Sequence, residues 1–161
     1  MKLRGLPVER FPRWETPPFT DKDKGVGPVV SKEGYTFDVP GLTALNTQDY
    51  SAQISAFKKN DDQLLTGIMT PPDFATFLGQ AKQQGYNPKA ATIGMALLFP
   101  SSVDALGDLG DGLTTEVWWH PSWPTKSSLT GITPKELCAL YEEKTGKQWT
   151  QPIGYVEALF E

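Results

Sequence analysis

Short apolar or alternating segments recur along the chain and predict the strands of a sheet. The segment YTFDVP alternates apolar and polar residues and stops at Pro40, as a strand does. Uninterrupted apolar runs are typical of strands buried on both faces. They predict inner strands over Leu64 to Met69 and Thr92 to Met95, and the run LTTEVWW predicts a third over Thr114 to Trp118.

Two segments between and after these strands carry complete helix signals. In TPPDFATFLGQAKQQG, Thr70 predicts the N-cap, Pro71 the first helical position and Asp73 a capping box. Apolar residues then recur every three or four positions until Gly85, which predicts the end of the helix. TPKELCALYEEKTG repeats the pattern from Thr133 onward, and weaker helical spacing is present in TQDYSAQISAFKKN and GVGPVVSKEG.

The order of these elements is strand, helix, strand, helix, strand. It predicts a three-layer α/β fold with a mainly parallel sheet and helices on both faces. In such folds ligands bind at the carboxyl ends of the strands. Those ends fall near Val39–Pro40, Met69–Thr70, Met95–Ala96 and Trp118–Trp119.

The first twenty residues differ from the rest in composition. They contain four prolines and mixed charge between Leu6 and Phe19, which predicts an irregular N-terminal arm over 1–20. The α/β unit is therefore expected over 21–161. The beginning of the chain has positive charge but no apolar stretch after it, so no signal peptide is expected, and expression as written would leave the chain in the cytoplasm.

Composition narrows the class of function. At 161 residues with 39% apolar positions, the chain is the size of one domain with a real core. A net charge of −4, with no basic cluster beyond Lys58–Lys59, argues against a nucleic-acid partner. No apolar run approaches the roughly 18 residues that a membrane span needs.

The cysteine and histidine counts exclude most metal and hydrolytic chemistry. The one cysteine, Cys138, allows no internal disulfide and no cysteine-based zinc site, and it falls in a helical pattern as a small buried residue. The one histidine, His120, has no second histidine to share a metal with. Because there is also no Ser-His-Asp order and no paired carboxylate motif, the sequence predicts a protein that is not an enzyme and holds no cofactor or metal.

The stretch GDLGDGLTTEVWWHPSWP, residues 107–124, combines glycines, aspartates and tryptophans. A calcium loop needs oxygen ligands at alternate positions, whereas Asp104, Asp108 and Asp111 are four and three residues apart. A phosphate loop needs Gly-Lys-Ser/Thr, or glycines that join a strand to a helix, and neither is present. The glycines are therefore expected to end a short helix at Ser101–Leu106 and turn the chain into the next strand.

The tryptophans of this stretch leave two readings open. Adjacent side chains of a strand point to opposite faces, so one of Trp118 and Trp119 can lie in the core while the other faces a cleft. The aromatic rings then either cover the edge of the core or form a wall for a small organic ligand. Glu116 is expected on the same side of the strand as Trp118, in a solvated or ion-paired role.

Four segments together resemble one known family. They are DYSAQISAFKK, TGIMTPPDFATFLGQAKQQGYNPKAATIG, ALLFPSSVDALGDLGDGLTTEVWW and KSSLTGITPKELCALYEEKTGKQWTQPIGYVEALFE, which lie between Gly25 and Glu161. In order and spacing the chain resembles the periplasmic solute-binding proteins of the branched-chain amino acid type, which serve ABC importers. The resemblance implies a clamp of two α/β lobes with the solute between them, of which this chain is similar to the C-terminal lobe.

The resemblance also implies partners and contact residues. The implied partners are a small organic solute, a separate N-terminal lobe and an ABC permease, and the implied location of the chain is the periplasm. Thr70 and Pro71 match a cleft-lining position where relatives often place an aromatic residue. Met95 and Ala96 lie near the place where amino-acid-binding relatives hold a carboxylate for the ligand ammonium. No acid stands there, so amides, aromatic acids and other small solutes join amino acids as candidates, with Trp118 or Trp119 supplying a ring face.

Other functions fit the sequence less well. The tryptophans suggest a carbohydrate-binding module, but such modules are usually β-sandwiches, and two capped helices argue against one. A fragment that folds and self-associates without tight ligand binding remains the alternative. The apolar segment Ile153–Phe160 and the tryptophan loop predict a homodimer, by covering exposed apolar surface or by exchange of the arm Leu6–Phe19.

Overall fold

The computed structural model describes residues 2–6, 26–40 and 43–154. Within them, five strands form one sheet in the order β2-β1-β3-β4-β5, and every pair of neighbours is parallel. This confirms the parallel α/β fold expected from the sequence. The strands are β1 (Lys2–Leu6), β2 (Thr36–Asp38), β3 (Leu64–Met69), β4 (Ala90–Met95) and β5 (Leu113–Thr114).

Strand β1 is the element that sequence periodicity missed. It pairs with β2 on one side and with β3 on the other, so it lies in the middle of the sheet. The expectation of an irregular arm over 1–20 is wrong for Lys2–Leu6, and residues 7–20 lie outside the described residues. KLRGL contains a glycine and two cations instead of an apolar run, so its local pattern does not predict a central strand.

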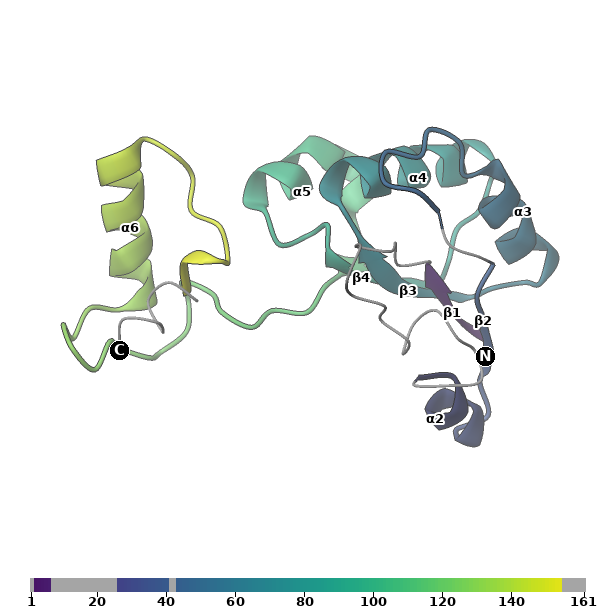
Figure 1. Cartoon of the computed structure of the whole chain (residues 1–161), viewed down its shortest axis with the longest axis horizontal. Helices are drawn as coiled ribbons and strands as arrows, with labels where there is room; N and C mark the ends of the chain where they lie inside the picture. Colours follow the sequence, from purple (N-terminus) through teal and green to yellow (C-terminus); the bar gives the residue numbers. More distant parts are fainter. Residues whose placement is uncertain (1, 7–25, 41–42, 155–161) are drawn as a thin grey trace.

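The helices lie on both sides of this sheet. Figure 1 shows α3 and α4 along one face and α2 on the opposite side, next to β2. Right-handed crossovers require this, because the chain moves in one direction from β1 to β2 and in the other from β2 to β5. Every helix in the described part of the chain is too short or too polar to span a lipid bilayer. The helices are α2 (Val26–Lys32), α3 (Ser51–Lys59), α4 (Pro71–Gln83), α5 (Pro100–Leu106), the short 3₁₀ helix η1 (Gly107–Gly110) and α6 (Pro134–Thr145).

The two helices with complete sequence signals begin where predicted, but their caps differ. At α6 the capping box is complete, with Thr133 and Glu136 each accepting from the other's backbone N–H. At α4 the Thr70 hydroxyl accepts from the Asp73 N–H at 3.4 Å, and it also donates to the Asp73 carboxylate at 2.7 Å. The Asp73 side chain thus bonds the capping hydroxyl, where a capping box would bond the backbone N–H of Thr70.

The core lies between the α3–α4 pair and the strands β3 and β4. Phe77 of α4 is completely buried and makes edge-to-face contacts with Tyr50 and Phe57. Phe57 also stacks on Tyr86, with ring centroids 5.5 Å apart. These ring contacts join α3 and the residue before it to α4 and the turn after it in one buried layer. The buried cluster comprises Tyr50, Ile54, Phe57, Leu65, Met69, Phe74, Phe77, Ala81, Tyr86, Ala91, Ile93 and Ala96.

Strand β5 is shorter than the sequence predicted. The expected strand over Thr114 to Trp118 is wrong, because only Leu113 and Thr114 pair with β4. The chain beyond Thr114 leaves the sheet and runs to α6, which Figure 1 shows set apart from the sheet. An apolar run can leave a sheet when its aromatic residues pack elsewhere, and here Trp119 packs against Trp149 and Gly154, which follow α6 in the chain.

A small second cluster forms around α6. The Trp119 ring lies against Gly154 and meets Trp149 edge to face, with ring centroids 6.3 Å apart. His120 also meets Trp149 edge to face, with ring centroids 5.7 Å apart. Cys138 of α6 is buried, as expected for a small residue in a helical pattern. Trp119 is therefore a core residue of this second cluster.

Candidate ligand-binding site

The strand order defines where an α/β sheet of this kind binds ligands. The chain leaves β1 toward β2 on one side, whereas β3, β4 and β5 follow on the other side. The connections therefore diverge between β1 and β3, and the crevice outside the carboxyl ends of such strands is the usual ligand site. Among the described residues, Met69 and Met95 are the last residues of β3 and β4, the two longest strands, and they are paired in register. The carboxyl ends of these two strands form the edge of the sheet at which the candidate site lies.

Thr70 and Pro71 lie at this edge, directly after β3. Thr70 caps α4, and Pro71 is the first residue of that helix. A helix N-terminus usually offers free N–H groups to an anion. Here Pro71 and Pro72 have no N–H, and those of Asp73 and Phe74 bond the hydroxyl and carbonyl of Thr70. The first turn of α4 is thus already satisfied, and it carries the carboxylate of Asp73.

Met95 and Ala96 lie beside them, at the end of β4. Met95 has a positive φ of 64°, and the N–H of Ala96 donates to the carbonyl of Gly94 at 2.7 Å. Together these features form a tight three-residue turn. Its backbone conformation is unfavourable for methionine and persists only where the surrounding structure holds it. Ala96 is buried in the core cluster, so its side chain belongs to the core, and Met95, half-buried, is the more accessible of the two.

The structure therefore brings four of the six predicted site residues together. Thr70, Pro71, Met95 and Ala96 share the edge formed by the ends of β3 and β4. Trp118 and Trp119 do not join them through a strand, because β5 ends at Thr114. Trp119, which is 9% exposed, is covered by its own cluster near α6.

One residue near this edge was not predicted to take part. Glu116 follows β5 by two residues, and its carboxylate oxygens lie 2.8 and 3.1 Å from the position that a Cβ on Gly94 would occupy. Within the described residues, the hydrogen bond made by this carboxylate is accepted from the Thr115 hydroxyl at 3.2 Å. The signal in the sequence was Gly94 itself, since a glycine inside a strand often marks the close approach of another group.

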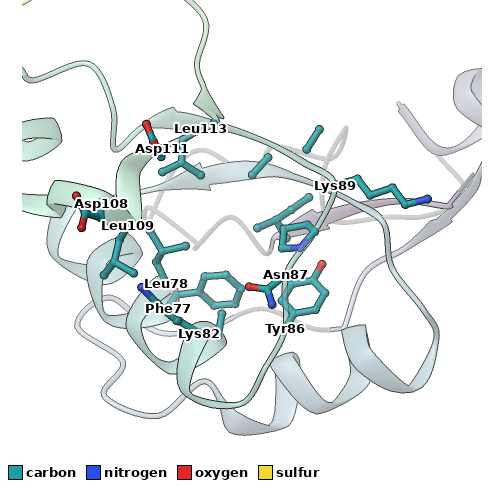
Figure 2. A pocket seen from close by; sticks show the side chains of 16 residues that line it. Phe77, Leu78, Lys82, Tyr86, Asn87, Lys89, Asp108, Leu109, Asp111 and Leu113 are labelled. Atoms are coloured by element: carbon teal, nitrogen blue, oxygen red, sulfur yellow. The ribbon is translucent and has the colours of Figure 1, made fainter.

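A pocket of about 300 Å³ lies elsewhere, near the amino-terminal ends of β4 and β5. Figure 2 shows Phe77, Leu78 and Leu109 around it, with Asp108 and Asp111 nearby. These residues come from the later part of α4 and from η1 and the turn after it, so the pocket is at the opposite edge of the sheet from Thr70 and Met95. The pocket is therefore separate from the candidate site.

No metal centre accompanies the site in the part of the chain that the structure describes. There, no three histidine, cysteine or acidic side chains lie close enough together to hold an ion. The chemistry available at this edge is hydrogen bonding, apolar contact and the charge of carboxylates.

Comparison with known proteins shows which family the chain belongs to. Residues 21–159 match the family described as periplasmic binding protein. The chain belongs to the periplasmic binding protein family. Its members are solute-binding proteins and not a family of enzymes. A search among curated proteins finds no significant match.

Two solved structures have the same fold. The leucine-binding protein LivK from Thermotoga maritima is 20% identical with a TM-score of 0.64, and 97% of this chain aligns with 42% of that protein. A protein from Rhodospirillum rubrum described as a branched-chain amino acid ABC transporter is 15% identical with a TM-score of 0.63, covering 91% of this chain and 39% of that one. The chain thus spans about two fifths of the length of both proteins.

Proposed function

We propose that the chain binds a small organic solute at the carboxyl ends of β3 and β4, as one lobe of a receptor for an ABC importer. The observation that carries this proposal is the juxtaposition of Thr70 and Met95 at the diverging edge of the sheet, in a chain of a solute-binding family. The solute is an amino acid, an amide or an aromatic acid. The setting is the periplasm, with a separate N-terminal lobe and an ABC permease as partners.

The geometry of the edge supports a clamp in which this lobe supplies part of the contacts. Met95 is half-buried, and Thr70 and Pro71 are also partly exposed, so side chains are available without unfolding the core. Trp118 and Trp119 contribute no ring face in this proposal, because the chain leaves the sheet before reaching them. One lobe alone buries only a fraction of a solute, so the isolated chain should bind more weakly than roughly 10 µM.

A direct test is titration of the isotope-labelled chain by NMR with leucine, leucinamide and benzoate. Shifts confined to the backbone amides of Thr70, Met95 and Ala96 would support the proposal. Shifts around Asp108 and Leu113 would instead assign the solute to the pocket at the other edge. A sub-micromolar complex with one solute per chain would contradict the idea of a half-clamp, and no shift with any solute class would refute the proposed function.

The second candidate is a fragment that folds and self-associates without tight binding. One observation favours it: large apolar side chains are exposed in the segment between β5 and the end of α6. Val117 is 46% exposed, Leu129 66% and Leu140 45%. Where such side chains form one contiguous patch, that patch marks contact with another protein surface, and pairing of two copies about a twofold axis would cover it. The expected assembly is a homodimer.

Sedimentation velocity at about 100 µM, a concentration at which a moderate-affinity dimer forms, tests this candidate. Replacing Leu129 and Leu140 by aspartate should convert the dimer to a monomer. Val103, which is 40% exposed on α5, provides the control, because Val103→Asp places the same charge on a different exposed apolar residue. A wild-type chain that sediments as a clean monomer would remove the candidate.

A further inference from the structure

A row of side chains on the sheet explains the pocket near the amino-terminal ends of β4 and β5. Leu65 of β3 and Ala91 of β4 are paired in register, and Ala91 is paired in turn with Leu113 of β5. Residues paired in register point to the same face of a sheet, so these three side chains lie side by side. All three line the pocket. The small alanine between two leucines leaves room at the centre of the row.

The helix that covers this row leaves room as well. Ala81 of α4 lines the pocket and is buried, as is Ala91. Phe77, one turn earlier in α4, forms part of the wall and is held by edge-to-face contacts with Tyr50 and Phe57. The inner walls are thus apolar and already fixed in the free protein, which lowers the entropic cost of binding a ligand there.

The volume of the pocket, about 300 Å³, limits what can enter it. An apolar cavity of about 150 Å³ is large enough to bind benzene. The pocket therefore has room for one six-membered ring with a short chain attached, and it falls at the lower end of the size range of small-molecule sites. Leu109 and Leu113 supply further apolar surface for such a ring.

The opening of the pocket carries more negative than positive charge. Asp108 of η1 and Asp111, the residue after η1, are exposed and line it on one side (Figure 2). Among the described residues, neither carboxylate makes a hydrogen bond or an ion pair. Lys82 of α4 also lines the pocket, whereas the ammonium of Lys89 points away from it and donates to the amide oxygen of Gln63 at 3.1 Å. Two carboxylates and one ammonium are therefore left at the opening, which favours a cationic ligand.

We propose that this pocket is a second binding site, for small molecules that combine one aromatic ring with a short chain ending in a cationic amine. The ring lies between Ala81 and Ala91, and the ammonium faces Asp108 and Asp111 at the opening. Because the pocket is at the opposite edge of the sheet from Thr70, this inference does not depend on the proposed function.

NMR titration of the full isotope-labelled chain with three probes tests the proposal. The probes share a phenyl ring: 2-phenylethylamine is cationic, 2-phenylethanol neutral and 3-phenylpropanoate anionic. The amine should bind most tightly and the acid most weakly, with shifts at the backbone amides of Leu109 and Leu113.

Three results would overturn the proposal. Equal binding of the three probes would show that the ligand need not be cationic. Shifts at Thr70 and Met95 alone would place the amine in the candidate solute site instead. No saturable shift with the amine at about 10 mM, well above the Kd of a weak small-molecule site, would show that the pocket binds no such ligand.

Charge variants should change the affinity for the amine in opposite directions. Asp108→Asn and Asp111→Asn should each weaken amine binding about threefold, the effect of losing one exposed ion pair, and leave 2-phenylethanol unchanged. Lys82→Gln removes the cation at the opening and should tighten amine binding by a similar factor. Asp104→Asn is the control for net charge, because Asp104 is exposed but does not line the pocket. An equal loss with Asp104→Asn would contradict a specific contact with Asp108 and Asp111.

A variant that fills the pocket tests its position independently of charge. Ala91→Val adds two methyl groups at the centre of the row and should abolish binding of all three probes, while a β-branched residue suits a strand of the sheet. Thr92→Val, on the other face of β4, is the control and should bind as the wild type does. Urea unfolding checks that both variants are folded. A folded Ala91→Val chain that binds the amine as tightly as the wild type would rule the pocket out as the site.

Discussion

Trp119 packs face to face with the backbone of Gly154. A Cβ added to Gly154 would lie 2.3 Å from Cγ of the Trp119 ring and 2.6 Å from both of its neighbours. No side chain fits into that space, so the indole can lie there only because residue 154 is glycine. The contact joins the segment after β5 to the segment after α6, and these two segments supply the aromatic rings of the second cluster.

Replacing Gly154 by alanine should therefore disrupt the second cluster. Overpacking of this kind costs about 1–3 kcal/mol, and the combined emission of the five tryptophans should shift as the Trp119 ring becomes exposed. Urea unfolding followed by tryptophan fluorescence measures both effects. The control is Gly79→Ala in α4, where a Cβ meets nothing within 4 Å. Alanine there should stabilise the chain by about 0.5–1 kcal/mol, so a loss at both positions would contradict the packing argument.

The N-cap of α4 gives a second prediction. Thr70→Ala removes the hydroxyl that accepts from the Asp73 N–H and donates to the Asp73 carboxylate. The expected loss is about 0.5–2 kcal/mol in urea unfolding. Thr76→Ala is the matched control, since that hydroxyl only bonds the Pro72 carbonyl within the same helix. Losses of equal size for the two variants would mean that Thr70 does not act as a cap.

The sequence predicted best where local signals and tertiary structure agree. Both capped helices begin at the predicted residues, Pro71 and Pro134, because an N-cap hydroxyl followed by proline is a signal within one turn. The inner strands β3 and β4 were also predicted, since each is an apolar run buried by the helices. These elements are determined by residues close to one another in the chain.

The predictions failed where contacts between residues far apart in the sequence determine the structure. KLRGL becomes a central strand because β2 and β3 flank it, which no local pattern encodes. Trp119 leaves the expected strand because Gly154, 35 positions later in the sequence, offers a flat surface for its ring. Thr70 and Met95 of the candidate site were predicted from the ends of apolar runs and from a family resemblance, whereas the contact between Glu116 and Gly94 depends on the placement of β5.

The capping box of α6 should make stability depend on pH. Hydrogen bonds from the backbone N–H and then the hydroxyl of Thr133 lower the pKa of Glu136 below its ordinary value of 4.5. A carboxylate with a lowered pKa in the folded state stabilises the protein above the unfolded pKa. That contribution is thus present above about pH 4.5 and is lost as the pH falls through the lower, folded value.

Urea midpoints at pH 7 and pH 3 would measure this dependence. Glu136→Gln keeps a side chain that can accept from Thr133 but does not titrate, so its midpoint should fall less between the two pH values than that of the wild type. Glu143→Gln changes an exposed carboxylate on the same helix and serves as the control for net charge. The same fall for Glu136→Gln and the wild type would show that the capping carboxylate is not responsible.

The turn at Met95 gives the last prediction. Three non-glycine residues in the described part have positive φ, and the other two are Asn46 and Asp61, whose short polar side chains tolerate it. Methionine does not, so Met95→Gly should be more stable than Met95→Ala by about 1 kcal/mol, although glycine also loses the Cβ that alanine keeps. The same pair of variants at Thr92, which has ordinary strand geometry in β4, should show the opposite order, because glycine weakens a strand. Urea unfolding of the four variants measures these differences in stability. An alanine at position 95 as stable as glycine would mean that the backbone there is free to relax, and that the end of β4 is not held in a fixed conformation.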